Sequence, residues 1–437
     1  MRKIEIPDRS YRYITDDSRF CDSNTAFLMT AQNSKFDSQS CCKKIELSEI
    51  SELFGINQIK IIGITGTNGK TTTSSLIYSI LLDLGYKVAL QGTRGFFVND
   101  RKVEEKGHTT PPILDTYRHI YQAVAEDCDY FIMEVSSHSI AQNRIESLEF
   151  ALKIHTNITG DHLDYHKNME EYIRVKNSFF ADESMKLLNK DDTNIDFNYK
   201  NAYTYSLESG SSFKMLAYSL TKGLSGMVQF FQEVEDFDSS LYGFFNLYNI
   251  LASISAVKLL TQKPLREISD QIENFYGIEG RMEVVSEKPL IIVDFAHTPD
   301  GMEQVLNSLR EKEIIVVFGA GGDRDKIKRA PMGAIAKKYG KHIIVTSDNP
   351  RFEEPEKITD AILKGIKDKD GVEVILNRRE AIRRGIQLQN EKSDEVEEKV
   401  LLILGKGDEK YQTIYDKEIP FDDREVVREI LDGEYVK

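Results

Sequence analysis

The chain has 437 residues, of which 40% are hydrophobic and 29% are charged, and its net charge is −14. This length predicts two or three domains, and the composition is typical of a soluble globular protein rather than of a disordered chain. The acidic balance argues against a general nucleic-acid binder, and no apolar run approaches the length of a membrane span or of an N-terminal signal segment.

Residues 1–57 are polar and weakly periodic, with strand character only at 11–14 and 26–30, and we expect a small domain here. The chain contains four cysteines, which are Cys21, Cys41, Cys42 and Cys128. Their spacing matches no metal site. We therefore expect four reduced, structural thiols, as in a cytoplasmic protein.

The chain from 58 to 283 alternates between strand and helix patterns. Strands are predicted at 59–64, 87–90, 130–135, 151–158 and 185–189, and helices at 70–84, 112–126, 169–180 and 246–262. Gly85 is expected to cap the first helix at its C-terminus. This alternation predicts a parallel sheet with helices on both faces. Short antiparallel strands at 202–207 and 227–234 are expected to extend the sheet.

Residues 284–437 repeat the alternation. Strands are predicted at 289–296, 313–319, 342–347, 372–377 and 399–405, and helices near 300–310, 328–339, 355–366 and 378–389. This pattern predicts a separate, Rossmann-like, doubly wound domain. The charge-dense segment 391–399 is expected to be a solvated loop. The predicted fold class is therefore α/β, with three domains.

The most informative motif is TGTNGKT at 65–71, between an apolar strand and a helix. Its small residues let backbone amides surround a phosphate, and the start of the helix adds the positive end of its dipole. Lys70 can then reach the terminal phosphates of a nucleotide, and Thr71 can bind the accompanying magnesium ion. Ile64 stands where this motif usually has its first glycine. The flanking strand and helix nevertheless favour an ATP site over a structural turn.

Three further clusters in the central domain have two interpretations each. Glu134, in MEVSSH at 133–138, is placed either to bind the magnesium ion or to cap the next helix, and the nearby nucleotide motif favours the ion. The segment 156–166 carries two histidines and two aspartates, which suit a metal site and loop caps equally well. TTPP at 109–112 opens a predicted helix, where it could bind an anion or serve as an ordinary N-cap.

Four polar clusters that contain glycine or proline follow strands of the last domain. They are DFAHTPD at 294–300, FGAGGDRDK at 318–326, SDNPR at 347–351 and GKGDE at 405–409. The carboxyl ends of parallel strands meet at one edge of a sheet, where ligands bind. We therefore expect these clusters to line a single ligand crevice.

The ordered set of motifs resembles the Mur ligase family, ATP-dependent enzymes that add amino acids to the UDP-N-acetylmuramoyl peptide of bacterial cell walls. The resemblance runs from residue 59 to FDDR at 421–424, and it includes DHLDYH at 161–166, GFFNLYN at 243–249 and GRME at 280–283. It implies a UDP-binding domain at 1–57, an ATP-binding domain at 58–283 and an amino-acid-binding domain at 284–437.

The implied activity is the addition of meso-2,6-diaminopimelate to UDP-N-acetylmuramoyl-L-alanyl-D-glutamate through an acyl phosphate. This reaction belongs to cytoplasmic peptidoglycan synthesis, which supports cell shape and cell division. A monomer acting on these small molecules, without nucleic acid or membrane insertion, is expected. The N-terminal domain is shorter than is usual in the family.

The resemblance also assigns roles to residues of the ATP site. ATP is implied to contact Gly66, Thr67, Asn68, Gly69, Lys70, Thr71, Thr72, Asn246, Asn249, Arg281 and Asp294. One magnesium ion is implied on Thr71 and Glu134, and a second on Glu134 and His162. Lys176, in RVK at 174–176, matches the family lysine that carbon dioxide converts into a carbamate, which is an oxygen ligand for magnesium. Local sequence alone favours a surface lysine at this position.

Two substrate sites are implied as well. The UDP-linked muramoyl dipeptide would contact Ser18, Thr109, Thr110, Ser136, Gln142 and Arg144. The diaminopimelate pocket would contain Arg324, Asp348, Asn349, Arg351, Gly405 and Glu409. Diaminopimelate differs from lysine by a second carboxylate, which the guanidinium of Arg351 can bind with two hydrogen bonds. Asp408 stands where the family usually has histidine, so the resemblance does not fix the fine shape of the pocket, whereas its charges are expected to be kept.

Three alternatives remain open from the sequence. A relative that uses lysine or folylpolyglutamate is disfavoured by Arg351 and by Thr109, Thr110 and Ser136. A P-loop ATPase that drives partner binding would hydrolyse ATP without the dipeptide, and it leaves the four clusters of the last domain unexplained. A catalytically silent binding protein is disfavoured because every expected phosphate and metal position is filled.

Overall fold

The computed structural model describes residues 3–6, 11–30, 32–33, 42–105, 107–221, 223–391 and 399–435. The chain forms two compact units. The first comprises Met1–Tyr218, Ser225–Ser239 and Leu247–Phe275, and the second comprises Ser219–Leu224, Ser240–Asn246 and Tyr276–Lys437. Among the helices described, we find none that combines the length and the apolar character needed to cross a membrane.

The chain begins with a small sheet that belongs to the first unit. Its strands are β1 (Ile4–Glu5), β2 (Tyr13–Thr15), β3 (Thr25–Leu28) and β4 (Lys43–Ile45), in that order. The predicted strands near 11–14 and 26–30 are confirmed as β2 and β3. The sequence pattern missed β1, which has only two residues, and β4, in which two exposed lysines precede one buried isoleucine. Neither is long or regular enough to show an alternating pattern. Within the described residues, Cys21, Cys42 and Cys128 form no disulfide bond, and Cys41 lies outside those residues.

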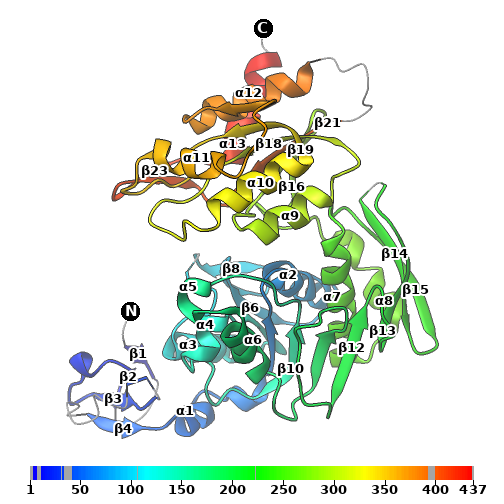
Figure 1. Ribbon diagram of the computed structural model, residues 1–437. Coiled ribbons are helices and arrows are strands. Elements are labelled where there is room, and N and C mark those ends of the chain that lie inside the picture. The colour runs from blue at the N-terminus through cyan, green and yellow to red at the C-terminus, as the bar shows by residue number, and fades with distance from the viewer. Residues whose placement is uncertain are drawn as a thin grey trace. The chain divides into compact units, whose positions relative to one another are not determined.

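The main sheet of the first unit has eleven strands in the order β15-β14-β13-β12-β11-β10-β5-β9-β6-β7-β8. Its predicted strands are confirmed as β5 (Lys60–Thr65), β6 (Val88–Gly92), β9 (Tyr130–Glu134), β10 (Phe150–His155) and β11 (Lys186–Asn189), and its predicted helices as α2 (Lys70–Asp83), α3 (Ile113–Ala125), α6 (Met169–Ser178) and α7 (Phe245–Thr261). Strand β5 lies between β10 and β9 and is parallel to both. The glycine motif therefore follows an interior strand. Figure 1 shows strands β6 and β10 of this sheet together with helices α2, α3, α6 and α7.

Three predictions for this sheet were wrong or incomplete. Strand β12 (Ala202–Ser206) is parallel, not antiparallel, to β11 and to β13 (Phe213–Ser219). The strand predicted at 227–234 is two strands, β14 (Leu224–Phe230) and β15 (Glu233–Ser239), because the chain turns at Phe231, where φ is 51°. That turn contains no glycine or proline to signal it. The hairpin of β7 (Gly95–Val98) and β8 (Arg101–Glu104) was not predicted.

The second unit contains a six-stranded sheet in the order β16-β17-β21-β18-β19-β20. Strand β16 (Glu283–Glu287) is antiparallel to β17, and the other neighbours are parallel. The predicted strands are confirmed as β17 (Leu290–Asp294), β18 (Glu313–Phe318), β19 (Gly340–Val345), β20 (Val372–Val374) and β21 (Lys399–Leu404). Of the loop predicted at 391–399, residues 392–398 lie outside the described part of the chain.

Helices cover both faces of this sheet, which confirms the doubly wound prediction (Figure 1). Helices α9 (Pro299–Asn307), α10 (Arg329–Tyr339) and α11 (Pro355–Leu363) pack on one set of alternating strand residues. Helices α12 (Arg378–Asn390) and α13 (Asp423–Tyr435) pack on the other set. A short hairpin of β22 (Tyr411–Ile414) and β23 (Lys417–Pro420) precedes α13. Because strands β17 to β21 are parallel to one another, their carboxyl ends lie at the same edge of the sheet.

Candidate active site

The glycine loop at 66–69 connects β5 to the 14-residue helix α2. Gly69 has a φ of 84°, and a Cβ there would lie 2.4 Å from Oδ1 of Asn249. A Cβ on Gly66 would lie 1.8 Å from Oγ1 of Thr156. Nζ of Lys70 donates to the carbonyls of Gly66 and Thr67, at 2.7 and 2.8 Å. The loop is therefore a tight backbone cradle with its lysine folded over it, and this geometry fits a phosphate chain.

The segment after β10 braces this loop from the side. The amide of Thr67 donates to the carbonyl of Asn157 at 2.7 Å, and the amide of Asn68 donates to Oδ1 of Asn157 at 3.0 Å. Oγ1 of Thr156 donates to the carbonyl of Asn68 at 2.6 Å. Thr156 and Asn157 were noted in the sequence only as part of a possible metal cluster. In the structure they hold the glycine loop in place.

Glu134, at the end of β9, is almost fully buried and joins two threonines. Its Oε2 accepts hydrogen bonds from Oγ1 of Thr71 at 3.0 Å and from Oγ1 of Thr93 at 3.1 Å, and its Oε1 accepts from the amide of Thr93 at 2.9 Å. The next helix, α4 (Ser137–Ala141), is capped by Ser136, so the capping interpretation of Glu134 is wrong. A carboxylate and a hydroxyl oxygen in contact at the head of α2 fit a magnesium site. Thr93 was not predicted.

Lys176 is 1% exposed, which excludes the surface-lysine interpretation. Its Nζ lies 3.5 Å from Oγ1 of Thr65, at the end of β5, and 5.1 Å from the ring centre of Tyr172. Burial lowers the pKa of Lys176 well below its usual value, the charge of Lys70 lowers it further, and Asp161 opposes the shift. The amine is therefore biased toward its neutral, nucleophilic form.

His162 lies among other rings beside this lysine. Its Nε2 is 3.3 Å from Oδ2 of Asp161, and its ring centre is 5.0 Å from that of His138. Burial lowers the pKa of His162, Asp161 opposes the shift, and His138, Lys70 and Lys176 add to it. Within the described residues, no three His, Cys, Asp or Glu side chains are arranged to hold a metal ion. The second magnesium site on Glu134 and His162 stays a prediction.

Five of the six residues predicted to hold the muramoyl dipeptide are near one another. The amide of Ser136 donates to Oγ1 of Thr110 at 3.0 Å, and Arg144 donates to the carbonyl of Thr110 at 2.9 Å and to Oε1 of Gln142 at 2.6 and 2.9 Å. Oγ1 of Thr109 lies 3.1 Å from Oγ1 of Thr93, which also donates to Glu134. Thr110 also donates to the carbonyl of Glu134 at 2.8 Å.

Helix α3 begins only at Ile113, after both prolines, and its N-cap is Pro112. The N-cap interpretation of Thr109 and Thr110 is therefore wrong. The sixth residue, Ser18, lies in a 3-10 helix (Ser18–Phe20) of the N-terminal sheet.

The remaining predicted ATP residues are divided between the units. Asn249 lies in the first unit, where its Oδ1 accepts from Oγ1 of Thr73 at 3.3 Å. In the second unit, both carboxylate oxygens of Asp294 accept backbone amides, those of Met282 and Ala296, at 2.7 Å each. The guanidinium of Arg281 lies 4.3 Å from the ring centre of Phe295. Asn246 donates to the carbonyl of Tyr242 at 2.7 Å.

The predicted amino-acid residues gather at the carboxyl edge of the second sheet. Nδ2 of Asn349 donates to Oε2 of Glu409 at 2.8 Å, and Nζ of Lys406 donates to Oε2 of Glu409 at 3.0 Å and to Oδ1 of Asn349 at 3.2 Å. A Cβ on Gly405 would lie 2.6 Å from Oδ2 of Asp348. These contacts confirm that the clusters at 347–351 and 405–409 meet. Lys406 is fully buried, and it was predicted only as a member of the cluster at 405–409, without a role of its own.

Arg351 and Arg324 lie at the glycine turn of this same edge. Nη1 of Arg351 donates to the carbonyl of Gly322 at 2.8 Å. A Cβ on Gly321 would lie 3.1 Å from Nη1 of Arg351 and 3.6 Å from Cγ of Arg324. The cluster at 318–326 therefore adjoins the one at 347–351.

The glycine turn is itself held by a buried ion pair. Arg329 donates from Nη1 and Nη2 to the two carboxylate oxygens of Glu353, at 2.8 Å each, and from Nη2 to the carbonyl of Gly321 at 3.1 Å. The bonds from Arg329 lower the pKa of Glu353 to about 2. Glu353 is therefore ionised in the folded state at all but very acidic pH.

Replacing Glu353 with glutamine should lower the free energy of unfolding by about 3 kcal/mol at neutral pH, because Arg329 would be left buried without its counter-charge. Since the folded pKa lies below the usual value of 4.5, this stabilisation is present above pH 4.5 and is lost as the pH falls toward 2. Urea unfolding across this pH range should show wild type and variant converging. The matched control is Glu354→Gln, in an exposed pair with Lys357, which should change little. An equal loss of unfolding free energy in Glu353→Gln and Glu354→Gln would contradict a stabilising role for the pair of Arg329 and Glu353.

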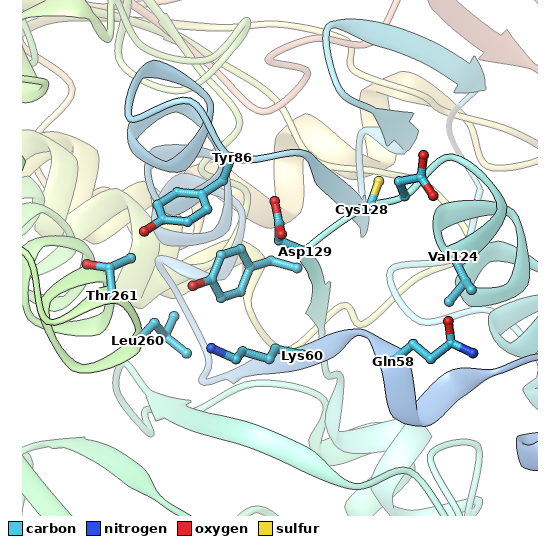
Figure 2. Close-up of a pocket in the computed structure, with 10 residues that line it drawn as sticks. Gln58, Lys60, Tyr86, Val124, Cys128, Asp129, Leu260 and Thr261 are labelled. Atoms are coloured by element: carbon cyan, nitrogen blue, oxygen red, sulfur yellow. The ribbon is translucent and has the colours of Figure 1, made fainter.

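A separate cavity of about 490 Å³ lies at the opposite, amino-terminal end of β5 and β9. Figure 2 shows Lys60, Tyr86 and Thr261 around it. It is lined by Gln58, Lys60, Tyr86, Val124, Asp127, Cys128, Asp129, Tyr130, Leu260 and Thr261. None of the predicted site residues lines it. The candidate active site is therefore at the other end of these strands.

Two domain models match this chain. Residues 64–257 match the Mur ligase middle domain, and residues 280–407 match the Mur ligase glutamate ligase domain. A protein of Wolinella succinogenes named UDP-N-acetylmuramoyl-L-alanyl-D-glutamate--2,6-diaminopimelate ligase is 52% identical over 422 residues, which cover 96% of each chain. The chain belongs to the Mur ligase family. Enzymes of this family use ATP and Mg²⁺.

Other Mur ligases and related structures agree with this assignment. A Helicobacter pylori protein of the same name is 49% identical over 98% of this chain and 97% of its own length. A solved structure of UDP-N-acetylmuramoyl-L-alanyl-D-glutamate--2,6-diaminopimelate ligase is similar with a TM-score of 0.69 at 27% identity, covering 99% of this chain and 98% of that one. The folylpolyglutamate synthase of Mycobacterium tuberculosis, solved with ADP and AMPPCP, has a TM-score of 0.65 at 17% identity, with coverage of 82% and 91%. This last likeness concerns the fold alone.

Proposed function

We propose that this Mur ligase joins meso-2,6-diaminopimelate to UDP-N-acetylmuramoyl-L-alanyl-D-glutamate and converts ATP into ADP and phosphate. The single observation that carries the proposal is the cluster of Asn349, Lys406 and Glu409, with Arg351 on the same loop as Asn349. It offers carboxylate and guanidinium groups to a substrate that has both ammonium and carboxylate ends. The name of the 52% identical relative supports the same substrates.

The reaction follows from the groups in the first unit. The γ-phosphate of ATP passes to the free carboxylate of the muramoyl dipeptide, and the product is an acyl phosphate. The amine of the amino acid then attacks the acyl carbon, and the tetrahedral intermediate collapses to an amide and phosphate. Lys70 and the amides of the glycine loop stabilise the charge on the phosphoryl oxygens. No side-chain nucleophile is needed.

Thr71 and Glu134 would hold one magnesium ion, which neutralises phosphate charge when bound. Lys176 is proposed to react with carbon dioxide as a neutral amine and to become a carbamate, whose oxygens would join His162 around a second ion. Its burial and lowered pKa support this assignment. The cluster of Thr109, Thr110, Ser136, Gln142 and Arg144 is proposed to bind the dipeptide, because it adjoins Glu134.

The division into domains at 1–57, 58–283 and 284–437 is part of the proposal. The first would bind the UDP group with Ser18 as one contact, the second ATP and the third the amino acid. A monomer in the cytoplasm is the proposed state, since the substrates of the reaction are small cytoplasmic molecules.

The proposal is tested by measuring phosphate release with ATP, Mg²⁺ and UDP-N-acetylmuramoyl-L-alanyl-D-glutamate, with either meso-diaminopimelate or L-lysine. We expect meso-diaminopimelate to be preferred by about 100-fold or more in kcat/KM, because lysine leaves Arg351 without a carboxylate partner. Replacing Arg351 with alanine should lower kcat/KM for diaminopimelate by about 100-fold. The control is Arg383→Ala, an exposed arginine of α12 paired with Glu380.

Each alternative gives a different result. Equal turnover of the two amino acids would contradict the specificity but leave the ligase activity. ATP hydrolysis that does not depend on the UDP-linked dipeptide would instead favour a P-loop ATPase coupled to partner binding.

A further inference from the structure

Arg378 is a buried guanidinium at the start of α12. Its Nε and Nη2 donate to the two carboxylate oxygens of Asp423, at 2.7 Å each, and neither side chain is exposed to solvent. Asp423 is the first residue of α13. A bidentate pair of this kind fixes both partners in orientation as well as in distance.

The same guanidinium reaches two loops of the sheet edge. Its Nη2 donates to the carbonyl of Leu404 at 3.0 Å, and its Nη1 donates to the carbonyl of Ser347 at 3.3 Å. Leu404 directly precedes Gly405, and Ser347 directly precedes Asp348. The strands before these loops, β21 and β19, are separated by β18, so no ladder hydrogen bond joins them. Arg378 bridges the gap between them.

The charge of Arg378 also interacts with the carboxylates of these two loops. Its pKa is raised, against burial, chiefly by Asp423 and also by Asp348 and Glu409. The charge of Arg378 is therefore stabilised by a carboxylate on each of the two loops as well as by Asp423. The hydrogen bonds and the charge of Arg378 therefore act on the same two loops, those after β19 and β21.

We propose that Arg378, held by Asp423, is a positioning residue for the amino-acid substrate. It sets the spacing between the loop of Asp348 and Asn349 and the loop of Gly405 and Glu409, so the C-terminal helix that begins at Asp423 contributes to amino-acid affinity. This inference rests on the proposed function, which assigns the amino acid to these loops.

The test is Arg378→Lys, which keeps the charge but loses the planar fork that reaches both carbonyls. The KM for the amino acid, measured by phosphate release with the other substrates saturating, should rise about tenfold or more, while the KM for ATP should stay within about twofold. Asp423→Asn, which keeps the shape of the partner and removes its charge, should raise the same KM. An unchanged KM for the amino acid in either folded variant would overturn the proposal. If neither variant folds, the pair is needed by the whole domain, and the positioning role is also rejected.

The matched control is Arg424→Lys. Arg424 is also buried and forms a similar fork with Asp422, at 2.9 and 2.6 Å, but its further partners are Glu279 and Glu283 rather than the two loops. The thermal stability of the Arg424→Lys variant should fall by as much as that of Arg378→Lys, but its KM for the amino acid should not rise. An equal rise of the KM for the amino acid in Arg378→Lys and Arg424→Lys would show a general effect of destabilisation and contradict the proposal. A wild-type protein without amino-acid-dependent turnover would instead contradict the proposed function.

Discussion

Replacing Lys70 with alanine should lower the rate of phosphate release by about 100- to 1,000-fold at saturating ATP, because a preorganised cation is lost where phosphoryl charge develops. In the structure, this amine lies over the glycine loop on the carbonyls of Gly66 and Thr67. It therefore sits where the phosphate chain is proposed to bind. The measurement is initial-rate phosphate release with both other substrates saturating.

The control for Lys70 is on the strand that leads to the same loop. Lys60 is exposed at the first position of β5 and lines the cavity at the opposite end of the strand. Lys60→Ala should retain the wild-type rate within about twofold, as surface substitutions usually do. A Lys70→Ala variant that is folded and as active as Lys60→Ala would contradict the phosphate-site assignment.

Replacing Lys176 with alanine should reduce activity by about 1,000-fold or more if its carbamate is a magnesium ligand, because the ion loses a negative oxygen ligand. The thermal stability of the Lys176→Ala variant, in contrast, is expected to stay the same or to rise. Lys176 is buried and its pKa is lowered, so removing the amine relieves a desolvation cost. Loss of activity with unchanged or higher thermal stability would separate a chemical role from a structural one.

Lys176→Glu should recover part of the activity, since a carboxylate supplies oxygen ligands without carbon dioxide. Wild-type activity should fall in buffer freed of carbon dioxide and return with bicarbonate, whereas the glutamate variant should not respond. The concentration of bicarbonate that the wild type needs for full activity should also increase as the pH falls, because protonation of the amine removes the form that reacts with carbon dioxide. Wild-type activity in Lys176→Ala would refute the carbamate role.

Most elements of the two large sheets follow from local pattern. The strand before the glycine loop and the helix after it were predicted within two residues, since an apolar run and a helical period are both contained in the segment itself. The glycine loop is equally local, because its backbone conformation depends on the glycines at 66 and 69. The turn at Phe231 carries no such local signal, and there the prediction failed.

The chemical roles of single residues were less accessible. Local sequence alone favoured a cap at Glu134 and a surface position for Lys176, and both of these alternatives are wrong. The partners of Glu134 are Thr71 and Thr93, and the amine of Lys176 is buried beside Thr65. The bridging role of Arg378 has no local signature at all. It depends on which strand lies between β19 and β21.

The sequence by itself determined the fold class, the glycine loop and the family, because each depends on a motif or a period carried by consecutive residues. Only the tertiary structure decided which side chains are buried, which oxygens share a site and which loops are tied together. Burial and pairing are set by residues far apart in the chain, such as Thr71 with Glu134 or Arg378 with Asp423, and local sequence carries no record of those contacts.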